Sequence, residues 1–384
     1  MLAIRKYIGG DRIIWAVIIV LSLYSLLSVY STSGILVLRN PGSSPTYYVF
    51  RHALLMLAGL FMVYLTHLVP YRYFSRLSQL LVIIVIPLLI ITLFFGQDVN
   101  EATRRLEVPL LGFTFQTSDL AKLALIVYVA RLLSQKQHEI RDLKKTIIPM
   151  VIPIGIICML IMPEDLSTAL ILLATCVILM YIGRVRTRHL LLLCLAGFTV
   201  IIIFAGISLL TQQENRAPTW WKRIESHFDS KEEPYQVQQA KIAIASGGIL
   251  GKFPGNSTQR NFLPHSYSDY IYAVIIEEYG LFLGGIPILL LYLILLYRAG
   301  VLVRKSTRTF PAFMAVGLTL GLVLQAMVHM AVAVDLIPVT GQPLPLVSMG
   351  GTSRIMTCIS LGIILSVSKG IKEQQKLESE GANT

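Results

Sequence analysis

Three carboxylates stand close together in the stretch from Ser246 to Gly280. Asp269 closes a glycine-rich polar segment, and Glu277 and Glu278 follow two turns later inside an apolar run of membrane length. A carboxylate at or below a bilayer surface is costly to keep ionised, so it needs partners or a chemical role. We therefore predict that the active site lies at Asp269.

Two further charged positions interrupt apolar sequence. Lys122 stands in S-D-L-A-K-L-A-L-I-V-Y, where it either snorkels to the surface or faces inward and binds anionic oxygen. Asp119, one turn away, favours the inward orientation. Asp165, in M-P-E-D-L-S-T-A, fits either a surface turn or a buried polar site. If both side chains are buried, we expect Lys122 and Asp165 to share a polar cavity that opens outward.

Two glycine-containing segments flank these acids. A polar helix pattern over 234–248 stops at glycines, which permit close backbone approach to a ligand. The segment P-V-T-G-Q-P-L-P-L-V-S-M-G-G-T-S-R, residues 338–354, cannot be helical throughout, and irregular backbone at a membrane is tolerated only beside protein or a wet cavity. It should line the same cavity as Asp269. Gly350 and Gly351 then open either an anion-binding helix or an ordinary glycine-start helix.

The composition is that of a membrane protein. Of the 384 residues, 55% are hydrophobic and only 14% are charged, which is far too apolar for a soluble globule of this size. The excess of 33 Lys and Arg over 21 Asp and Glu follows from the positive-inside rule, so nucleic-acid binding is not expected. The four cysteines fall in apolar runs without metal-type spacing, so neither a disulfide framework nor a zinc site is implied.

Apolar runs of about twenty residues predict an all-α, polytopic integral membrane protein with ten transmembrane helices. The predicted spans are 13–31, 50–69, 77–95, 116–134, 147–163, 166–183, 189–210, 269–297, 311–334 and 350–368. They form a single membrane domain, 1–369, with one long extracytoplasmic loop, 211–268, and a short, charged, disordered cytoplasmic tail, 370–384.

The distribution of basic residues orients these spans. An even number of spans puts both termini on one side, and a cytoplasmic assignment makes every short inside loop basic. The inside segments carry Arg72 and Arg76, Lys144 and Lys145, Arg184 to Arg188, Arg304 to Arg308, and Lys369 to Lys376. Both termini are therefore predicted to be cytoplasmic.

Several ordered motifs resemble one protein family over nearly the whole chain. The segments G-N-S-T-Q-R-N-F-L-P-H-S-Y-S-D-Y-I-Y-A-V-I-I-E-E-Y-G and P-V-T-G-Q-P-L-P-L-V-S-M-G-G-T-S resemble SEDS proteins, the family of FtsW, RodA and the sporulation member. F-Q-T-S-D-L-A-K-L-A, M-P-E-D-L-S-T-A and A-S-G-G-I-L-G-K resemble further blocks in the same order.

The resemblance implies an enzyme of the bacterial inner membrane. It would be a peptidoglycan glycosyltransferase that polymerises lipid II into glycan strands, beside a class B penicillin-binding transpeptidase and other divisome membrane proteins. Asp269 would be the catalytic general base. A divalent cation, Mg²⁺ or Mn²⁺, could assist at a site that the sequence does not identify, and no other cofactor is implied. The residues expected to contact substrate are Lys122, Asp165, Arg104, Gln259, Ser348, Gly350 and Gly351.

Four positions depart from the family pattern. Arg105 replaces an aromatic residue, His265 a glutamate, His329 an asparagine and Met349 a tyrosine. These departures leave the roles of the four positions open. The short tail and the motif spelling resemble the division member, FtsW, more than the elongation member, RodA. A lipid II flippase, or a scaffold for the transpeptidase, remains the alternative from another functional class, because buried charge between helices suits a transporter equally well.

The predicted topology can be tested by cysteine labelling. An impermeant thiol reagent added from outside should modify a cysteine placed at Ser230, in the long outer loop, but not one at Lys305, in a basic inside loop. The reverse pattern would contradict the orientation.

Overall fold

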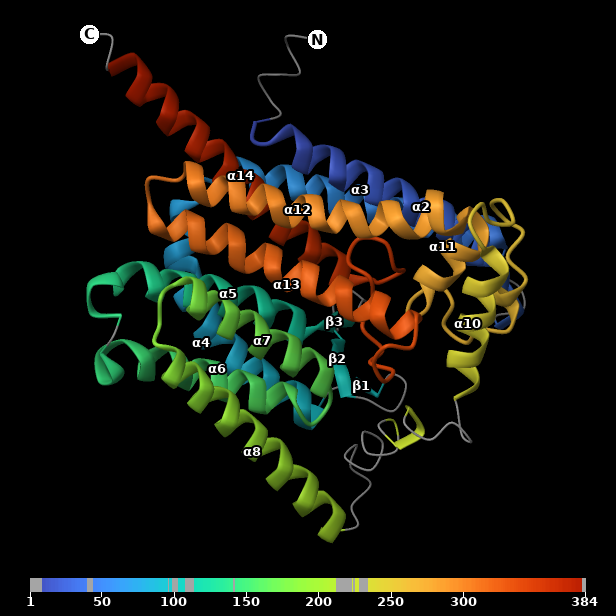
Figure 1. Ribbon diagram of the computed structural model, residues 1–384, viewed down its shortest axis with the longest axis horizontal. Helices are drawn as coiled ribbons and strands as arrows, with labels where there is room; N and C mark the ends of the chain where they lie inside the picture. Colours follow the sequence, from blue (N-terminus) through green and yellow to red (C-terminus); the bar gives the residue numbers. More distant parts are fainter. Residues whose placement is uncertain are drawn as a thin grey trace.

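The computed structural model describes residues 9–39, 44–95, 97–98, 103–107, 114–140, 142–211, 223, 225–227 and 234–381. The described chain is predominantly α-helical, as predicted, and its long helices lie side by side (Figure 1). The α-helices are α2 (Arg12–Arg39), α3 (Pro45–Leu68), α4 (Arg72–Phe95), α5 (Thr117–Gln135), α6 (Ile148–Ile161), α7 (Leu166–Ile182), α8 (Thr187–Thr211), α10 (Tyr235–Gly247), α11 (Ile271–Gly280), α12 (Ile286–Lys305), α13 (Thr309–Ala333) and α14 (Thr352–Gly381).

Eight helical segments of the described chain are long and apolar enough to cross a membrane. The two remaining predicted spans are also helical: α5 carries three charged residues, and α7 has only 17 residues. The chain is therefore a multi-pass membrane protein, while the number of ten crossings stays a prediction.

A small sheet that the sequence analysis did not foresee lies between α4 and α5. Its strands are β1 (Gln97–Asp98), β2 (Thr103–Glu107) and β3 (Thr114–Gln116), paired antiparallel in that order. In this register Arg105 lies opposite Gln116, the residue before the first turn of α5. The sheet therefore lies next to the end of α5 that carries Asp119 and Lys122.

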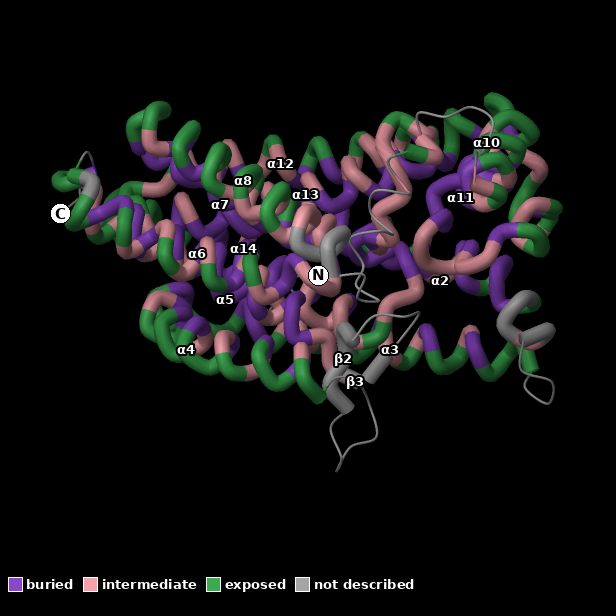
Figure 2. Tube along the Cα trace, turned by 90° about the horizontal axis from the view of Figure 1, so that it is seen from below, coloured by how far each residue is buried: buried purple, intermediate pink, exposed green. Residues whose placement is uncertain are grey.

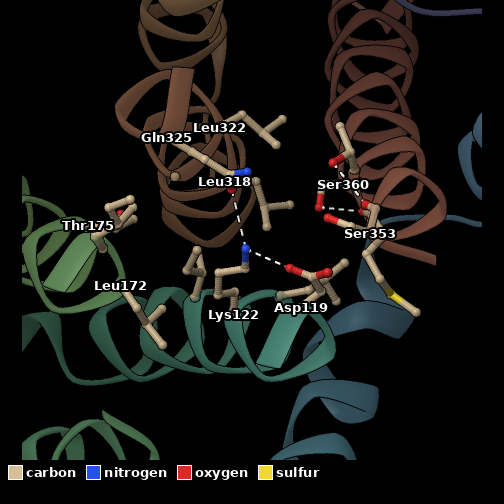
Figure 3. Close-up of a pocket in the computed structure, with 15 residues that line it drawn as sticks. Asp119, Lys122, Leu172, Thr175, Leu318, Leu322, Gln325, Ser353 and Ser360 are labelled. Atoms are coloured by element: carbon tan, nitrogen blue, oxygen red, sulfur yellow. Dashed lines mark hydrogen bonds and ion pairs between the residues drawn. The ribbon is translucent and has the colours of Figure 1, made fainter. Parts of the chain in front are cut away.

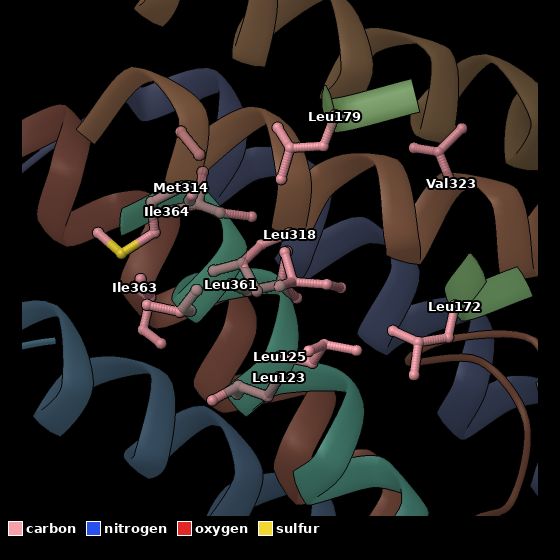
Figure 4. Close-up of a cluster of buried hydrophobic side chains, with 14 of the residues drawn as sticks. Leu123, Leu125, Leu172, Leu179, Met314, Leu318, Val323, Leu361, Ile363 and Ile364 are labelled. Carbon is pink, nitrogen blue, oxygen red and sulfur yellow. The ribbon is translucent and has the colours of Figure 1, made fainter. Parts of the chain in front are cut away.

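The centre of the bundle is built from α5, α7, α13 and α14. In the most apolar stretches of α13 and α14, 67% of the residues are buried. The corresponding share in α8, which lies at the edge of the bundle in Figure 1, is 11%. Figure 4 shows Leu125, Leu179 and Leu318 meeting among these helices. Figure 2 shows exposed residues mainly along the outer faces. Because these faces are apolar, they suit contact with lipid.

The predicted span 269–297 is two helices. Helix α11 ends at Gly280, which has φ +73°, and a π-helical turn, Leu281–Gly285, leads into α12. A Cβ on Gly280 would lie 2.2 Å from the carbonyl oxygen of Ile249, so the turn crosses the 249–251 backbone where only glycine fits.

The glycines at the end of α10 and just after it allow the two backbone segments to cross in close contact. A Cβ on Gly247 would lie 2.2 Å from the oxygen of Ile276, and one on Gly251 would lie 2.3 Å from the oxygen of Glu278. The Lys252 amide also donates to the Glu277 carbonyl at 2.9 Å. The prediction that the glycines ending the 234–248 pattern approach a ligand is therefore wrong for Gly247, because the space beside it is filled by α11.

The predicted disordered tail is also wrong as far as Gly381. Helix α14 continues through K-E-Q-Q-K-L-E-S-E to that residue. This stretch contains strong helix formers and no proline, and Lys376 pairs with Glu380 at 3.6 Å across one turn.

Candidate active site

Asp269 lies in the segment that leads into α11. Its amide donates to the His265 carbonyl at 3.0 Å, and its side chain is half-buried. Oδ2 lies 3.9 Å from the position that a Cβ on Gly341 would occupy. The Asp269 carboxylate makes no hydrogen bond or ion pair with the described residues, so its oxygens remain available to a substrate.

The loop between α13 and α14, residues 334–351, lies against Asp269. The Met349 amide donates to the Tyr267 carbonyl at 2.9 Å, and the Ser348 hydroxyl donates to the Ser268 carbonyl at 2.7 Å. The Leu344 amide donates to the same hydroxyl at 2.8 Å. We call this segment the α13–α14 loop; as expected from its irregular backbone, it is a neighbour of Asp269.

Side chains from four helices hold the carbonyls of this loop. Irregular backbone inside a membrane bundle must find such partners, because no water satisfies it there. Gln325 on α13 donates to Pro343 at 2.9 Å, and Tyr292 on α12 donates to Pro345 at 2.5 Å. Ser25 on α2 donates to Val347 at 2.8 Å, and Arg354 on α14 donates to Ser348 at 2.8 Å.

Asp165 contacts the same loop at Gln342. Its Oδ1 accepts from the Thr168 amide at 3.0 Å, which caps α7, and from Gln342 Nε2 at 3.2 Å. The Gln342 carbonyl in turn lies 2.8 Å from His329 Nδ1 on α13. Asp165 is only 5% exposed, so the surface-turn interpretation is wrong.

Lys122 faces inward. Its Nζ lies 2.7 Å from Asp119 Oδ1 and 3.3 Å from Gln325 Oε1 (Figure 3). It lines a cavity enclosed by α5, α7, α13 and α14, where Thr175 and Ser353 supply polar groups opposite it. Asp165 does not line this particular cavity, and a cavity shared by Lys122 and Asp165 stays a prediction.

The Lys122 cavity and Asp165 are instead joined through two amide side chains. Gln325 accepts from Lys122 and donates to Pro343, and the preceding residue, Gln342, donates to Asp165. A polar row therefore runs from Lys122 along the α13–α14 loop to Gly341, beside Asp269. The sequence analysis missed both glutamines; the signal was an amide in the last turns of a span and another between glycine and proline in the loop.

Glu277 and Glu278, unlike Asp269, accept hydrogen bonds from described side chains. Glu277 is fully buried and accepts from Lys252 Nζ at 2.8 Å and from the Thr258 amide at 3.1 Å, as well as from Ser257. Glu278 accepts from the Ser31 hydroxyl. Both carboxylates therefore hold the 252–261 segment against α11 and α2.

The remaining predicted substrate residues are in different situations. The Gln259 amide donates to Glu277 at 3.2 Å, while its Oε1 is buried without a described partner. Ser348 is 3% exposed, and its hydroxyl is already used in the loop. Gly350 and Gly351 precede α14; a Cβ on Gly350 would lie 3.8 Å from the Cβ of Ser353, and one on Gly351 would meet open space. Arg104 lies in β2, and its side chain is outside the described part of the structure.

The four unusual positions are structural where they are described. His265 adopts φ +58°, and its carbonyl accepts a hydrogen bond from the Asp269 amide. The His329 ring is hydrogen-bonded to the Gln342 carbonyl, and the Met349 amide donates to the Tyr267 carbonyl. Arg105 lies in β2, and nothing is described of its side chain.

Comparison with known proteins identifies the family of this fold and site. Residues 11–373 match the FtsW/RodA/SpoVE family model, described as cell cycle protein. The chain belongs to this family. One relative is the probable peptidoglycan glycosyltransferase FtsW of Nitrosococcus halophilus, 32% identical over 84% of this chain and 83% of the relative. Another is stage V sporulation protein E of Bacillus subtilis, 30% identical over 95% of this chain and 98% of the relative.

Solved structures of low sequence identity share the family fold. One such structure is of a peptidoglycan synthase complex and is described as showing the structural coordination of polymerization and crosslinking. A chain of that complex matches with a TM-score of 0.71 and 22% identity, over 94% of this chain and 97% of its own length. The rod shape determining protein RodA of Thermus thermophilus gives TM-score 0.66 and 22% identity, over 94% and 98%.

The partners of Glu277 predict a structural phenotype. Replacing Glu277 by Gln removes the charge that pairs with Lys252 and leaves buried donors unsatisfied. We therefore expect the free energy of unfolding to fall by about 2 kcal/mol or more. The measurement is thermal unfolding of the purified protein in detergent. Glu139→Gln is the matched control, because Glu139 forms an exposed pair with Lys145 at 3.5 Å. Equal melting temperatures for the Glu277 and Glu139 variants would contradict the assignment.

Proposed function

We propose that this protein is a peptidoglycan glycosyltransferase that polymerises lipid II into glycan strands for septal wall synthesis. Relatives named as probable peptidoglycan glycosyltransferase FtsW support the reaction. The single observation that carries the site is the contrast among the three acids. Glu277 and Glu278 accept hydrogen bonds from described donors, whereas the Asp269 carboxylate, beside the α13–α14 loop, has no partner among the described residues.

The proposed reaction follows from this arrangement. The 4-hydroxyl of an incoming lipid II sugar attacks the anomeric carbon of the growing chain, and Asp269 accepts the hydroxyl proton. The bond from the anomeric carbon to the diphosphate oxygen breaks, and undecaprenyl diphosphate leaves. The leaving group gains negative charge, which Lys122 and Arg104 would stabilise. Lys122 is already paired with Asp119, so the substrate's diphosphate would compete with that carboxylate for Nζ.

A divalent cation remains part of the proposal only as an ion shared with substrate. In the described part of the chain, no three His, Cys, Asp or Glu side chains gather as ligands. These residues therefore do not form a protein-built metal site. Mg²⁺ is commonly held by one or two carboxylates together with substrate phosphates. The steps assigned to Asp269 and Lys122 do not depend on the ion.

The proposed setting is a bacterial inner membrane, with both termini in the cytoplasm. A class B penicillin-binding transpeptidase is the proposed partner, and the peptidoglycan synthase complex with the same fold supports it. Other divisome membrane proteins would follow from a division role, which the FtsW relatives favour over an elongation role. We expect the partner's single membrane helix to pack on the exposed apolar faces. If co-purification survives disruption of that helix, the contact lies elsewhere.

A flippase for the lipid-linked precursor is the second candidate. The observation that favours it is the Lys122–Asp119 pair, which lies between helices as charged groups do in transporters. The two functions differ in product, since only the polymerase forms glycosidic bonds.

Asp269→Asn tests the proposed base. Asparagine keeps the shape but does not accept the hydroxyl proton, so polymerisation should fall by about 10²-fold or more while melting temperature and partner binding are unchanged. The measurement is glycan synthesis from lipid II by the purified variant. Asp142→Asn is the matched control: Asp142 accepts the Lys144 amide at 3.0 Å, at the opposite end of the bundle, and asparagine can replace it as a cap. A near-parental rate for folded Asp269→Asn would refute the catalytic assignment.

A further inference from the structure

A second polar cavity lies at the end of the bundle opposite Asp269. It is enclosed by the α3–α4 turn, the start of α13 and the last turns of α14, and its volume is about 730 Å³. In Figure 1 these elements lie at the left, whereas α10 and α11 lie at the right. A volume of this size accommodates a small ligand or a headgroup. None of the residues proposed for the glycosyl transfer lines it.

The walls of this cavity are strongly cationic. Four cations and one carboxylate line it: Arg72, Arg76, Arg308 and Lys369, with Glu373. None of the four cations forms an ion pair with a described carboxylate, whereas other cations of the same chain, such as Arg298 with Asp11, do. The four come from three separate elements, so the fold gathers like charges that would repel one another without an anion between them.

Three further features of the walls favour an anion. Helix α4 begins at Arg72 and α13 begins one residue after Arg308, so two helix N-termini, which favour negative charge, meet here. The His67 side chain is 1% exposed, and its Nε2 has no partner among the described residues. Its Nδ1 lies 2.8 Å from the Tyr64 carbonyl.

The position of the cavity decides the class of anion. The α3–α4 turn and the α12–α13 turn each join two helices that are long and apolar enough to cross a membrane. The ends of such helices are expected at the level of the lipid headgroups. Tyr71 and Tyr73 also line the cavity, and amphipathic aromatic rings are typical of that depth. Basic cavities between membrane helices at this level are known to receive anionic headgroups.

We propose that this cavity binds the phosphate headgroup of an anionic phospholipid from the surrounding leaflet. The arginines of two turns contact the phosphate, and the acyl chains lie along the outer faces of the helices. The bound headgroup joins the α3–α4 turn, α13 and α14. This proposal does not depend on the glycosyltransferase assignment.

The experiment is lipid titration of the delipidated full-length protein in detergent, read by native mass spectrometry and by melting temperature. Phosphatidylglycerol, phosphatidylcholine and inorganic phosphate are added separately. We expect one phosphatidylglycerol to bind preferentially and to raise the melting temperature, with no effect of phosphatidylcholine. Arg72→Gln/Arg308→Gln should weaken phosphatidylglycerol binding at least about tenfold, since each arginine offers a charge-assisted contact.

The matched control is Arg186→Gln/Arg188→Gln, which removes the same charge from exposed residues of another basic turn, between α7 and α8. This pair should bind within about twofold of the parent. If Arg72→Gln/Arg308→Gln does not fold, Arg76→Gln/Lys369→Gln tests the same cavity. Equal weakening by cavity and control pairs would overturn the proposal in favour of general surface charge. Stabilisation by inorganic phosphate alone would overturn the lipid assignment in favour of a soluble anion.

Discussion

A backbone segment without helical hydrogen bonds can lie inside a membrane bundle only when side chains satisfy its polar groups. The α13–α14 loop meets this requirement at Pro343, Pro345, Val347 and Ser348, each through a side chain of a different helix. Losing one donor would leave a buried carbonyl without a hydrogen bond and lower the free energy of unfolding by about 1–3 kcal/mol. The loop therefore depends on the arrangement of the bundle, and the position of Asp269 depends on the loop.

The same requirement governs the buried charges. Lys122, Asp165 and Glu277 each have partners within the bundle, and those partners connect segments distant in sequence. Asp269 differs because no described residue neutralises it, although it stands at the end of the polar row. This contrast with Lys122, Asp165 and Glu277 is why the proposed function places the general base at Asp269.

The sequence was sufficient to predict the long helices and the loop beside Asp269. Apolar length predicted these helices, apart from the break within 269–297, and the irregular composition of residues 338–354 predicted the loop. The inward orientation of Lys122 followed from Asp119 one turn away, a local relation that helical geometry preserves. These inferences rest on interactions within one element or between a loop and its nearest helix.

The predictions that were wrong or missing concern contacts between segments distant in sequence. Gly247 suggested a ligand, but the nearby atoms belong to α11, and no local pattern reveals which backbone a glycine approaches. Gln325 and Gln342 connect Lys122 to Asp165, yet each alone is an ordinary polar residue. The break at Gly280 depends on the same crossing. Such features need three-dimensional neighbours, which hydropathy and spacing do not encode.

The most direct test of the account is the product that the purified protein makes from lipid II alone. The account predicts long glycan polymers from lipid II, and none when the acceptor 4-hydroxyl is removed from the lipid II supplied, because attack by that hydroxyl is the step that the site serves. Movement of lipid II across a vesicle membrane without glycan formation would contradict it, and would make the polar row a transport path.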